Sequence, residues 1–187
     1  PILFKEQKID DCIIKNLGIK TKRLNLKPWN DYRSKVSKCK KSVKVAMIGK
    51  YVDLVDSYKS LNEALYHAGV LNSRVVEITY LDSEKITSAN IKSLRFMNAI
   101  LVPGGFGNRG IEGKILAAKF ARENNIPYLG ICLGMQISVI EYARNVLNLK
   151  NANSTEFNIK TNNPVVALVE EWKDCLLYTS DAADDLV

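Results

Sequence analysis

From Val43 onward, short apolar runs alternate with longer segments of helical periodicity. Apolar or β-branched runs bounded by turn residues predict strands, and apolar residues three and four apart predict helices. The expected strands are 43–48, 74–80, 99–102 and 126–131, and the expected helices are 57–68, 86–94, 111–124 and 133–147. Helical crossovers join parallel strands and cover both faces of a sheet. The pattern therefore predicts an α/β fold, a doubly wound and mostly parallel sheet with helices on both faces.

Two glycine-rich loops, Pro103–Gly107 and Gly130–Gly134, each follow an expected strand. In sheets of this type, ligands bind beyond the carboxyl ends of the strands. We therefore expect both loops to lie at one edge of the sheet and to form a binding site. A dinucleotide-binding fingerprint is the alternative for 103–110, but that motif follows the first strand of a sheet, whereas this loop follows a later one.

Cys132 lies between the two glycines of the second loop, at an expected strand-to-helix turn. This arrangement is typical of a nucleophile elbow, here with a thiol, because the close approach of strand and helix requires small neighbours. The positive end of the following helix favours the thiolate. The N–H of Leu133 is one candidate donor to the oxyanion of a tetrahedral intermediate, and the bare backbone of Gly104 and Gly105 could provide a second. The alternative interpretation is a small cysteine buried in the core.

A cysteine nucleophile normally acts with an imidazole base. The chain has a single histidine, His67, which falls on the expected helix 57–68, and we interpret it as an ordinary surface residue. The other cysteines are Cys12, Cys39 and Cys175, and none forms a CxxC pair or lies near the histidine. The spacing therefore predicts neither a metal site nor a disulfide framework.

Positive charge is concentrated at the start of the chain. The net charge is +7, and residues 1–44 alone contain 13 Lys and Arg against four acidic residues. Aromatic residues do not interleave these charges, so we interpret the segment as a solvated linker and expect no nucleic acid partner; phosphate-rich nucleotides of a neighbouring domain are the second choice. No apolar stretch is long enough to span a bilayer and the start lacks a signal-peptide pattern, so we expect a cytoplasmic location without membrane attachment.

Two local features precede Val43. Apolar residues at helical spacing predict a short helix over 9–17 that stops at Gly18. Pro28 and the Lys- and Ser-rich composition of 28–42 predict an interdomain linker.

Several segments resemble the glutaminase domain of the CTP synthase family, which is a class I glutamine amidotransferase. They are Gly49–Leu54 (GKYVDL), Asp56–Ser60 with Glu63–Leu65, Pro103–Lys114 (PGGFGNRGIEGK), Asn124–Gln136 (NNIPYLGICLGMQ) and Asn153–Phe157 (NSTEF). GICLGMQ alone indicates only the amidotransferase class, whereas GKYVDL and NSTEF narrow the resemblance to CTP synthases. The resemblance covers nearly all of residues 1–172.

The resemblance implies a division of the chain. Residues 1–27 are similar to the C-terminal end of the amidoligase (synthase) domain, 28–42 to the basic interdomain linker, and 43–172 to the N-terminal part of the glutaminase domain. Residues 173–187 resemble no part of the family, and we interpret them as an unrelated tail, a translated sequencing adapter at an assembly truncation. The expected sheet is accordingly incomplete at its C-terminal end.

The activity implied by the resemblance is hydrolysis of L-glutamine through a thioester on Cys132. The ammonia passes to the amidoligase domain, where UTP is aminated to CTP. ATP, UTP and Mg²⁺ are implied in that domain, GTP is implied as an activator, and no cofactor is implied in this chain itself. The implied partners are L-glutamine, the amidoligase domain of the same protein, and further copies in a homotetramer or filament.

The same motifs imply the site residues. Cys132 is the nucleophile, and Gly104 and Leu133 are the oxyanion donors. The implied glutamine-binding residues are Gly104, Gly105, Phe106, Leu133, Gly134, Met135, Gln136 and Glu156. We expect Glu156 to be a buried carboxylate that offsets burial of the substrate's ammonium, with an exposed surface carboxylate as the alternative. Arg109 is a candidate contact for GTP, or else it takes part in a surface salt bridge.

The family's catalytic His and Glu have no counterpart after Trp172, so we expect this chain by itself to turn glutamine over very slowly. One alternative function is a catalytically inactive binding or assembly module of the same fold. Another is a different hydrolase with a cysteine elbow, against which GKYVDL and NSTEF argue.

Overall fold

The computed structural model describes residues 1–50, 52 and 55–167. Tyr51, Asp53 and Leu54 of the GKYVDL motif lie outside the described residues, as do 168–187, which include the end of the predicted glutaminase segment and the predicted tail. The described residues divide into two compact units, one formed by 1–43 with 58–77 and the other by those within 44–57 and 78–167. None of the described helices is both long and apolar enough to cross a membrane.

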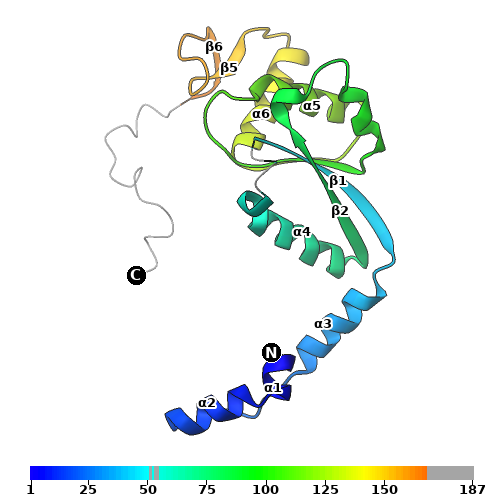
Figure 1. The fold of residues 1–187 in the computed structure, drawn as a ribbon. Coiled ribbons are helices and arrows are strands. Elements are labelled where there is room, and N and C mark those ends of the chain that lie inside the picture. The colour runs from blue at the N-terminus through cyan, green and yellow to red at the C-terminus, as the bar shows by residue number, and fades with distance from the viewer. Residues whose placement is uncertain (51, 53–54, 168–187) are drawn as a thin grey trace, which may run out of the picture. The chain divides into compact units, whose positions relative to one another are not determined.

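The first unit contains four helices, α1 (Ile2–Glu6), α2 (Ile9–Leu17), α3 (Lys27–Lys38) and α4 (Lys59–Leu71) (Figure 1). α2 ends where the sequence predicts, because Gly18 takes the left-handed conformation with φ 61° and its N–H donates to the carbonyl of Ile14. α3 occupies most of the segment expected to be a linker. A proline in the first turn is compatible with a helix, so Pro28 begins this helix rather than preventing it.

The main sheet contains β1 (Lys41–Gly49), β2 (Arg74–Asp82), β3 (Ala99–Val102) and β4 (Tyr128–Gly130), in the order β2-β1-β3-β4. β3 pairs in parallel with β1, where Ala46 lies opposite Ile100, and with β4, where Leu101 lies opposite Leu129. The predicted strands and the parallel pairing are confirmed. The chain continues from β1 to one side of the sheet and from β3 to the other. A topological switch point therefore lies between β1 and β3, the place where ligands bind in such sheets.

The core of the second unit lies against the sheet and between two helices, α5 (Ile111–Glu123) and α6 (Leu133–Asn145), which pack side by side (Figure 1). One cluster joins strands to α5 and to a 3₁₀ helix over Ile91–Phe96; it contains Ala46, Ile48, Ile91, Leu94, Ile100, Val102, Ala117 and Ala121. A second cluster joins α5 to α6 and contains Ile111, Ile115, Ala118, Leu133, Ile137 and Ile140. The strand residues that alternate with the first cluster, Val45, Met47 and Leu101, are buried too, as expected for a sheet covered on both faces.

The helix predicted over 86–94 is wrong. Asn90 accepts a hydrogen bond from the N–H of Thr87 (2.9 Å), and its side-chain amide donates to the carbonyl of Lys85 (2.7 Å). This local turn competes with helical hydrogen bonding, and the chain then forms only the 3₁₀ helix over Ile91–Phe96. The apolar spacing that suggested a helix is therefore outweighed by one asparagine side chain.

An ion pair with a buried carboxylate joins α5 to α6. Glu141 on α6 is 3% exposed, and its carboxylate accepts hydrogen bonds from Nε (3.1 Å) and Nη2 (2.8 Å) of Arg122 on α5. A planar two-point contact of this kind fixes orientation as well as distance. The two helices are thus joined toward their C-terminal ends.

A second, two-stranded parallel sheet follows α6, formed by β5 (Ala152–Ser154) and β6 (Asn163–Val166), and the sequence analysis does not predict it. β5 includes the first two residues of the NSTEF motif and so places Glu156. In the described part of the chain, β4 forms one edge of the main sheet, and Leu129 on it is 54% exposed.

Candidate active site

β4 leads through Ile131 and Cys132 into α6, and the backbone at Cys132 has φ 53° and ψ −105°. A non-glycine residue at positive φ is uncommon and indicates local strain. The surrounding backbone holds this conformation, since the N–H of Ile131 donates to the carbonyl of Val102 (3.0 Å) and the N–H of Gly134 donates to that of Ile131 (2.9 Å). The sharp strand-to-helix turn expected from the sequence is present, and Cys132 is exposed at the N-terminus of α6.

Gly130 and Gly134 permit this turn for steric reasons. A Cβ at Gly130 would lie 2.4 Å from the carbonyl group of Gly134, and a Cβ at Gly134 would lie 2.1 Å from the carbonyl oxygen of Val102. Both distances are far inside van der Waals contact, and both involve backbone atoms that cannot rotate away. The two positions flanking Cys132 therefore require glycine, as the sequence analysis expects.

Tyr128 on β4 supports the first turn of α6. Its hydroxyl donates a hydrogen bond to the carbonyl of Gly134 (2.8 Å). Burial raises the pKa of the Tyr128 hydroxyl, so the group stays protonated and remains a donor. The sequence analysis does not identify this residue; the signal for it is a polar aromatic residue on an otherwise apolar strand, two positions before Gly130.

The loop after β3 lies beside the thiol. A Cβ at Gly104 would contact the Cβ of Cys132 at 3.5 Å, and a Cβ at Gly105 would contact Cδ2 of Leu133 at 3.5 Å. The two glycine-rich loops therefore converge at the carboxyl ends of β3 and β4, as expected from the sequence. The bare backbone of Gly104 borders the space beside Cys132, where the N–H of Leu133 begins α6.

The same loop is fastened at Gly107, whose φ of 73° favours glycine. The ammonium of Lys50, at the end of β1, donates to the carbonyls of Phe106 and Gly107, the latter at 3.4 Å. The N–H of Gly107 donates to Oε1 of Glu156 (3.1 Å). The sequence analysis does not identify Lys50, although its place directly after β1, beside the switch point of the sheet, is a signal for it.

Glu156 is exposed, so the expectation of a buried carboxylate is wrong. The residue follows β5, and its N–H is held by Oγ of Ser154 (3.2 Å), which leaves the side chain beside the loop without enclosing it. Gln136, in the first turn of α6, is half-buried, and its Oε1 has no hydrogen-bond partner among the described residues. Of the other expected glutamine-binding residues, Phe106 is 83% exposed and Met135 is 52% exposed.

Comparison with known proteins places this arrangement in a family, because residues 53–181 match the glutamine amidotransferase class-I family. The chain belongs to this family. It is also similar to a solved structure, the glutaminase domain of Trypanosoma brucei CTPS with bound acivicin, at 41% sequence identity and a TM-score of 0.67. The match covers 71% of this chain and 52% of the other, so this chain spans about half the length of that structure. The resemblance to CTP synthase glutaminase domains is confirmed, and so is the α/β fold.

In this amidotransferase domain, Arg109 follows the glycine-rich loop and makes a surface ion pair. Its Nε lies 3.4 Å from Oε2 of Glu84, and its Nη2 donates to the carbonyl of Lys50 (3.3 Å). The Arg109 side chain is about half-exposed. The ion pair considered from the sequence is therefore present, and it leaves part of the guanidinium accessible.

A buried lysine of the amidotransferase domain neighbours these cations. Lys114 on α5 is 2% exposed, and its ammonium has no hydrogen bond or ion pair within the part of the chain that the structure describes. Burial lowers the pKa of Lys114 to about 8, and the positive charges of Lys50 and Arg109 act in the same direction. The sequence analysis does not identify Lys114, although it stands three residues after the buried Ile111 and thus on the inner face of α5.

The second unit of the amidotransferase supplies no imidazole to the thiol in its described part. His67, the single histidine of the sequence, lies on α4 in the first unit with its side chain 64% exposed. Its Nε2 lies 3.9 Å from Oε2 of Glu63. The interpretation of His67 as a surface residue is confirmed.

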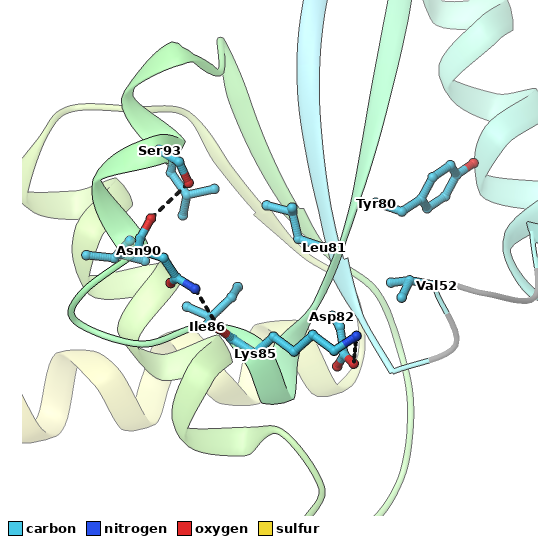
Figure 2. Close-up of a pocket in the computed structure, with 10 residues that line it drawn as sticks. Val52, Tyr80, Leu81, Asp82, Lys85, Ile86, Asn90 and Ser93 are labelled. Atoms are coloured by element: carbon cyan, nitrogen blue, oxygen red, sulfur yellow. Dashed lines mark hydrogen bonds and ion pairs between the residues drawn. The ribbon is translucent and has the colours of Figure 1, made fainter.

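A separate cavity of about 300 Å³ opens between the end of β2 and the 3₁₀ helix (Figure 2). Several of its polar groups are bonded to one another: Lys85 lies 3.8 Å from Asp82, and the hydroxyl of Ser93 donates to the carbonyl of Asn90 (2.9 Å). None of its lining residues belongs to the two glycine-rich loops. The cavity is therefore not part of the candidate active site.

Proposed function

We propose that this amidotransferase domain hydrolyses the side-chain amide of L-glutamine through a thioester on Cys132. The observation that carries the proposal is the exposed thiol at a strained turn, beside the bare backbone of Gly104 and the N–H of Leu133. The thiolate attacks the amide carbon, and the two N–H groups stabilise the resulting oxyanion. The C–N bond then breaks and ammonia leaves after nitrogen gains a proton. Water cleaves the thioester to give glutamate and to regenerate the thiol.

Gln136 and Glu156 hold the glutamine molecule in this proposal. The unpartnered Oε1 of Gln136 is a hydrogen-bond acceptor aligned with the first turn of α6. The carboxylate of Glu156 attracts the α-ammonium group of the substrate. The remaining glutamine-binding residues of the proposal are Gly105, Phe106, Leu133, Gly134 and Met135.

The ammonia serves, in the same proposal, an amidoligase domain that aminates UTP to CTP with ATP and Mg²⁺ in the cytoplasm. Support comes from the 41% identity to a CTPS glutaminase domain and from the GKYVDL and NSTEF motifs. Residues 1–27 would be the end of the amidoligase domain and 28–42 the connection to it. GTP activates the reaction with Arg109 as a contact, and the full-length protein forms a homotetramer or filament.

By itself, the chain should hydrolyse glutamine slowly, because the described part of the second unit holds no imidazole to deliver the proton to the leaving nitrogen. Removal of the base from a comparable catalytic unit lowers kcat by roughly a millionfold. The same observation favours one alternative, a catalytically inactive binding module. Release of glutamate from the chain above the level seen with Cys132→Ser would identify a slow enzyme and reject the inactive module.

Alkylation of Cys132 by 6-diazo-5-oxo-L-norleucine, a diazoketone analogue of glutamine, tests the proposed site. We expect an adduct on Cys132, located by peptide mass spectrometry, whose formation is slowed by L-glutamine and by acivicin but not by D-glutamine. Cys12 and Cys39, labelled in parallel with iodoacetamide, are internal controls for thiol reactivity. If iodoacetamide labels Cys132 and the analogue does not, or if L-glutamine gives no protection, the glutamine site is rejected.

A further inference from the structure

We propose that Lys50 and Glu156 are a pair of positioning residues that bind the C=O and the N–H of Gly107 and so fix the loop 104–107 beside Cys132. The inference rests on the proposed function, in which this loop carries an oxyanion donor. Neither side chain comes from the loop itself, since Lys50 follows β1 and Glu156 follows β5. The pair therefore joins two distant parts of the chain to one glycine.

The loop needs such support because its own residues provide little. Gly104, Gly105 and Gly107 have no side chains, and Phe106 between them is 83% exposed. Glycine loses more conformational freedom on ordering than any other residue. Contacts from outside the loop must therefore offset that entropy for the loop to keep one conformation.

Lys50 supplies the first of these contacts. Its ammonium donates to the carbonyl groups of Phe106 and Gly107, so one cation holds two successive peptide units. Hydrogen bonds with one charged partner are roughly twice as strong as those between neutral groups. Arg109 in turn donates to the carbonyl of Lys50 (3.3 Å), which ties the far end of the loop to the end of β1.

Glu156 supplies the second contact, to the N–H of the same residue. Its Oε1 accepts from the N–H of Gly107 at 3.1 Å, while the carbonyl of Gly107 faces Lys50. A carboxylate offers about four acceptor sites, so this bond leaves capacity for the ammonium of a substrate. Glu156 thereby links recognition of the substrate's ammonium to the position of the loop beside the thiol.

Hydrogen–deuterium exchange of the full 187-residue chain, read on peptides that cover 103–110, tests the pair without any substrate. Lys50→Met removes the donors and Glu156→Ala removes the acceptor, and each should raise exchange in the loop by about tenfold or more. Lys50→Arg and Glu156→Gln keep a donor and an acceptor, so they should retain most of the protection. Lys92→Met, which removes an exposed lysine of the 3₁₀ helix, is the matched control and should leave the loop unchanged.

Binding of L-glutamate γ-semialdehyde to the same variants relates the loop to the site. The thiol of Cys132 adds to the aldehyde: a C–S bond forms, the C=O π bond breaks, and the thiol proton ends on the oxygen. Lys50→Met and Glu156→Ala should weaken this binding by about tenfold or more, because the oxyanion donor is displaced. Glu156→Gln should weaken binding while loop protection is kept, since it loses only the attraction for the ammonium. Iodoacetamide labelling of Cys132 should stay within about twofold in every variant, because loop 104–107 does not hold the backbone turn that exposes the thiol.

Unchanged loop exchange in both Lys50→Met and Glu156→Ala would overturn the proposal, whatever the aldehyde does. A different pattern, raised loop exchange in both variants but no aldehyde bound by the unaltered chain, would reject the proposed glutaminase role and still support the pair. Recovery of protection in Lys50→Arg, with the same circular dichroism spectrum as the unaltered chain, shows that the effect of Lys50→Met is not general unfolding. Loss of protection in Lys50→Arg equal to that in Lys50→Met would count against a specific donor role.

Discussion

The two loops that meet at Cys132 are held by different means. The turn at Gly130–Gly134 is fixed by backbone atoms, through the close approach of Gly134 to Val102 of β3 and the hydrogen bonds of Ile131 with Val102 and of Gly134 with Ile131. The loop over 104–107 is fixed by charged side chains that lie 57 and 49 positions from Gly107 in the sequence. The position of the nucleophile therefore depends on backbone packing against the neighbouring strand, whereas the position of the oxyanion donor depends on two charged side chains.

The largest expected effect is the difference in stability between a glycine-to-alanine substitution in the turn at Gly130–Gly134 and the same substitution in loop 104–107. Gly134→Ala would place a Cβ 2.1 Å from the carbonyl oxygen of Val102, so strand and helix must move apart, and we expect a loss of stability of about 3 kcal/mol or more. Gly105→Ala would place its Cβ at an ordinary contact distance of 3.5 Å, and it should cost less than about 1 kcal/mol. Urea unfolding of both variants measures the difference. Equal losses would show that the turn is not under steric control.

The second effect is a pH dependence of the free energy of unfolding, which arises from Lys114 beside the cations Lys50 and Arg109. The pKa of Lys114 is about 8 in the folded chain and near 10.5 in the unfolded chain. Between these values the unfolded chain binds more protons, so stability rises with pH; below about pH 8 the cost of the buried charge is fully present. The free energy of unfolding should therefore rise by about 2 kcal/mol more in the unaltered chain than in Lys114→Met between pH 7 and pH 10.

Lys119→Met, which removes a partly exposed lysine from the same helix, is the control for that experiment. Its pH profile should follow that of the unaltered chain. Parallel profiles for Lys114→Met and the unaltered chain would mean that the ammonium of Lys114 is not held in a destabilising environment.

The smallest effect is expected from Tyr128→Phe. The variant loses the hydrogen bond to the carbonyl of Gly134 and should cost about 1 kcal/mol in stability. Because steric contacts hold the turn, the rate of iodoacetamide labelling at Cys132 should change by less than about twofold. A larger change in labelling would show that the turn, like the other loop, depends on a side chain for its geometry.

The same contrast explains which features could be predicted from the sequence. The strands, the parallel order and the turn at Cys132 follow from apolar runs and glycine positions, which act over a few residues. The 3₁₀ helix at Ile91–Phe96 could not be predicted from apolar spacing, because the side chain of Asn90 decides the backbone there. β5 and β6 are short and contain asparagine, serine and proline, which do not signal a strand.

The side chains that position the site were harder to predict than the nucleophile. Lys50 and Glu156 meet Gly107 only because three separate strand ends come together, and no local pattern encodes that meeting. Burial of the substrate's ammonium predicts a buried carboxylate at Glu156, yet the residue is exposed beside the loop. Lys114 resembles any helix lysine until the face of α5 that packs inward is known.

The contact between Arg122 and Glu141 does not by itself set the width of the site. Loop 104–107 runs into α5, the thiol stands at the start of α6, and the two helices are joined at both ends of α5. Arg122 binds Glu141 toward the C-terminal end of α5, while Ile111 and Leu133 share a buried cluster and Arg144 binds Glu112 (3.0 Å) at its N-terminal end. A substitution at Glu141 should therefore lower stability and leave the gap between Gly104 and the sulfur unchanged.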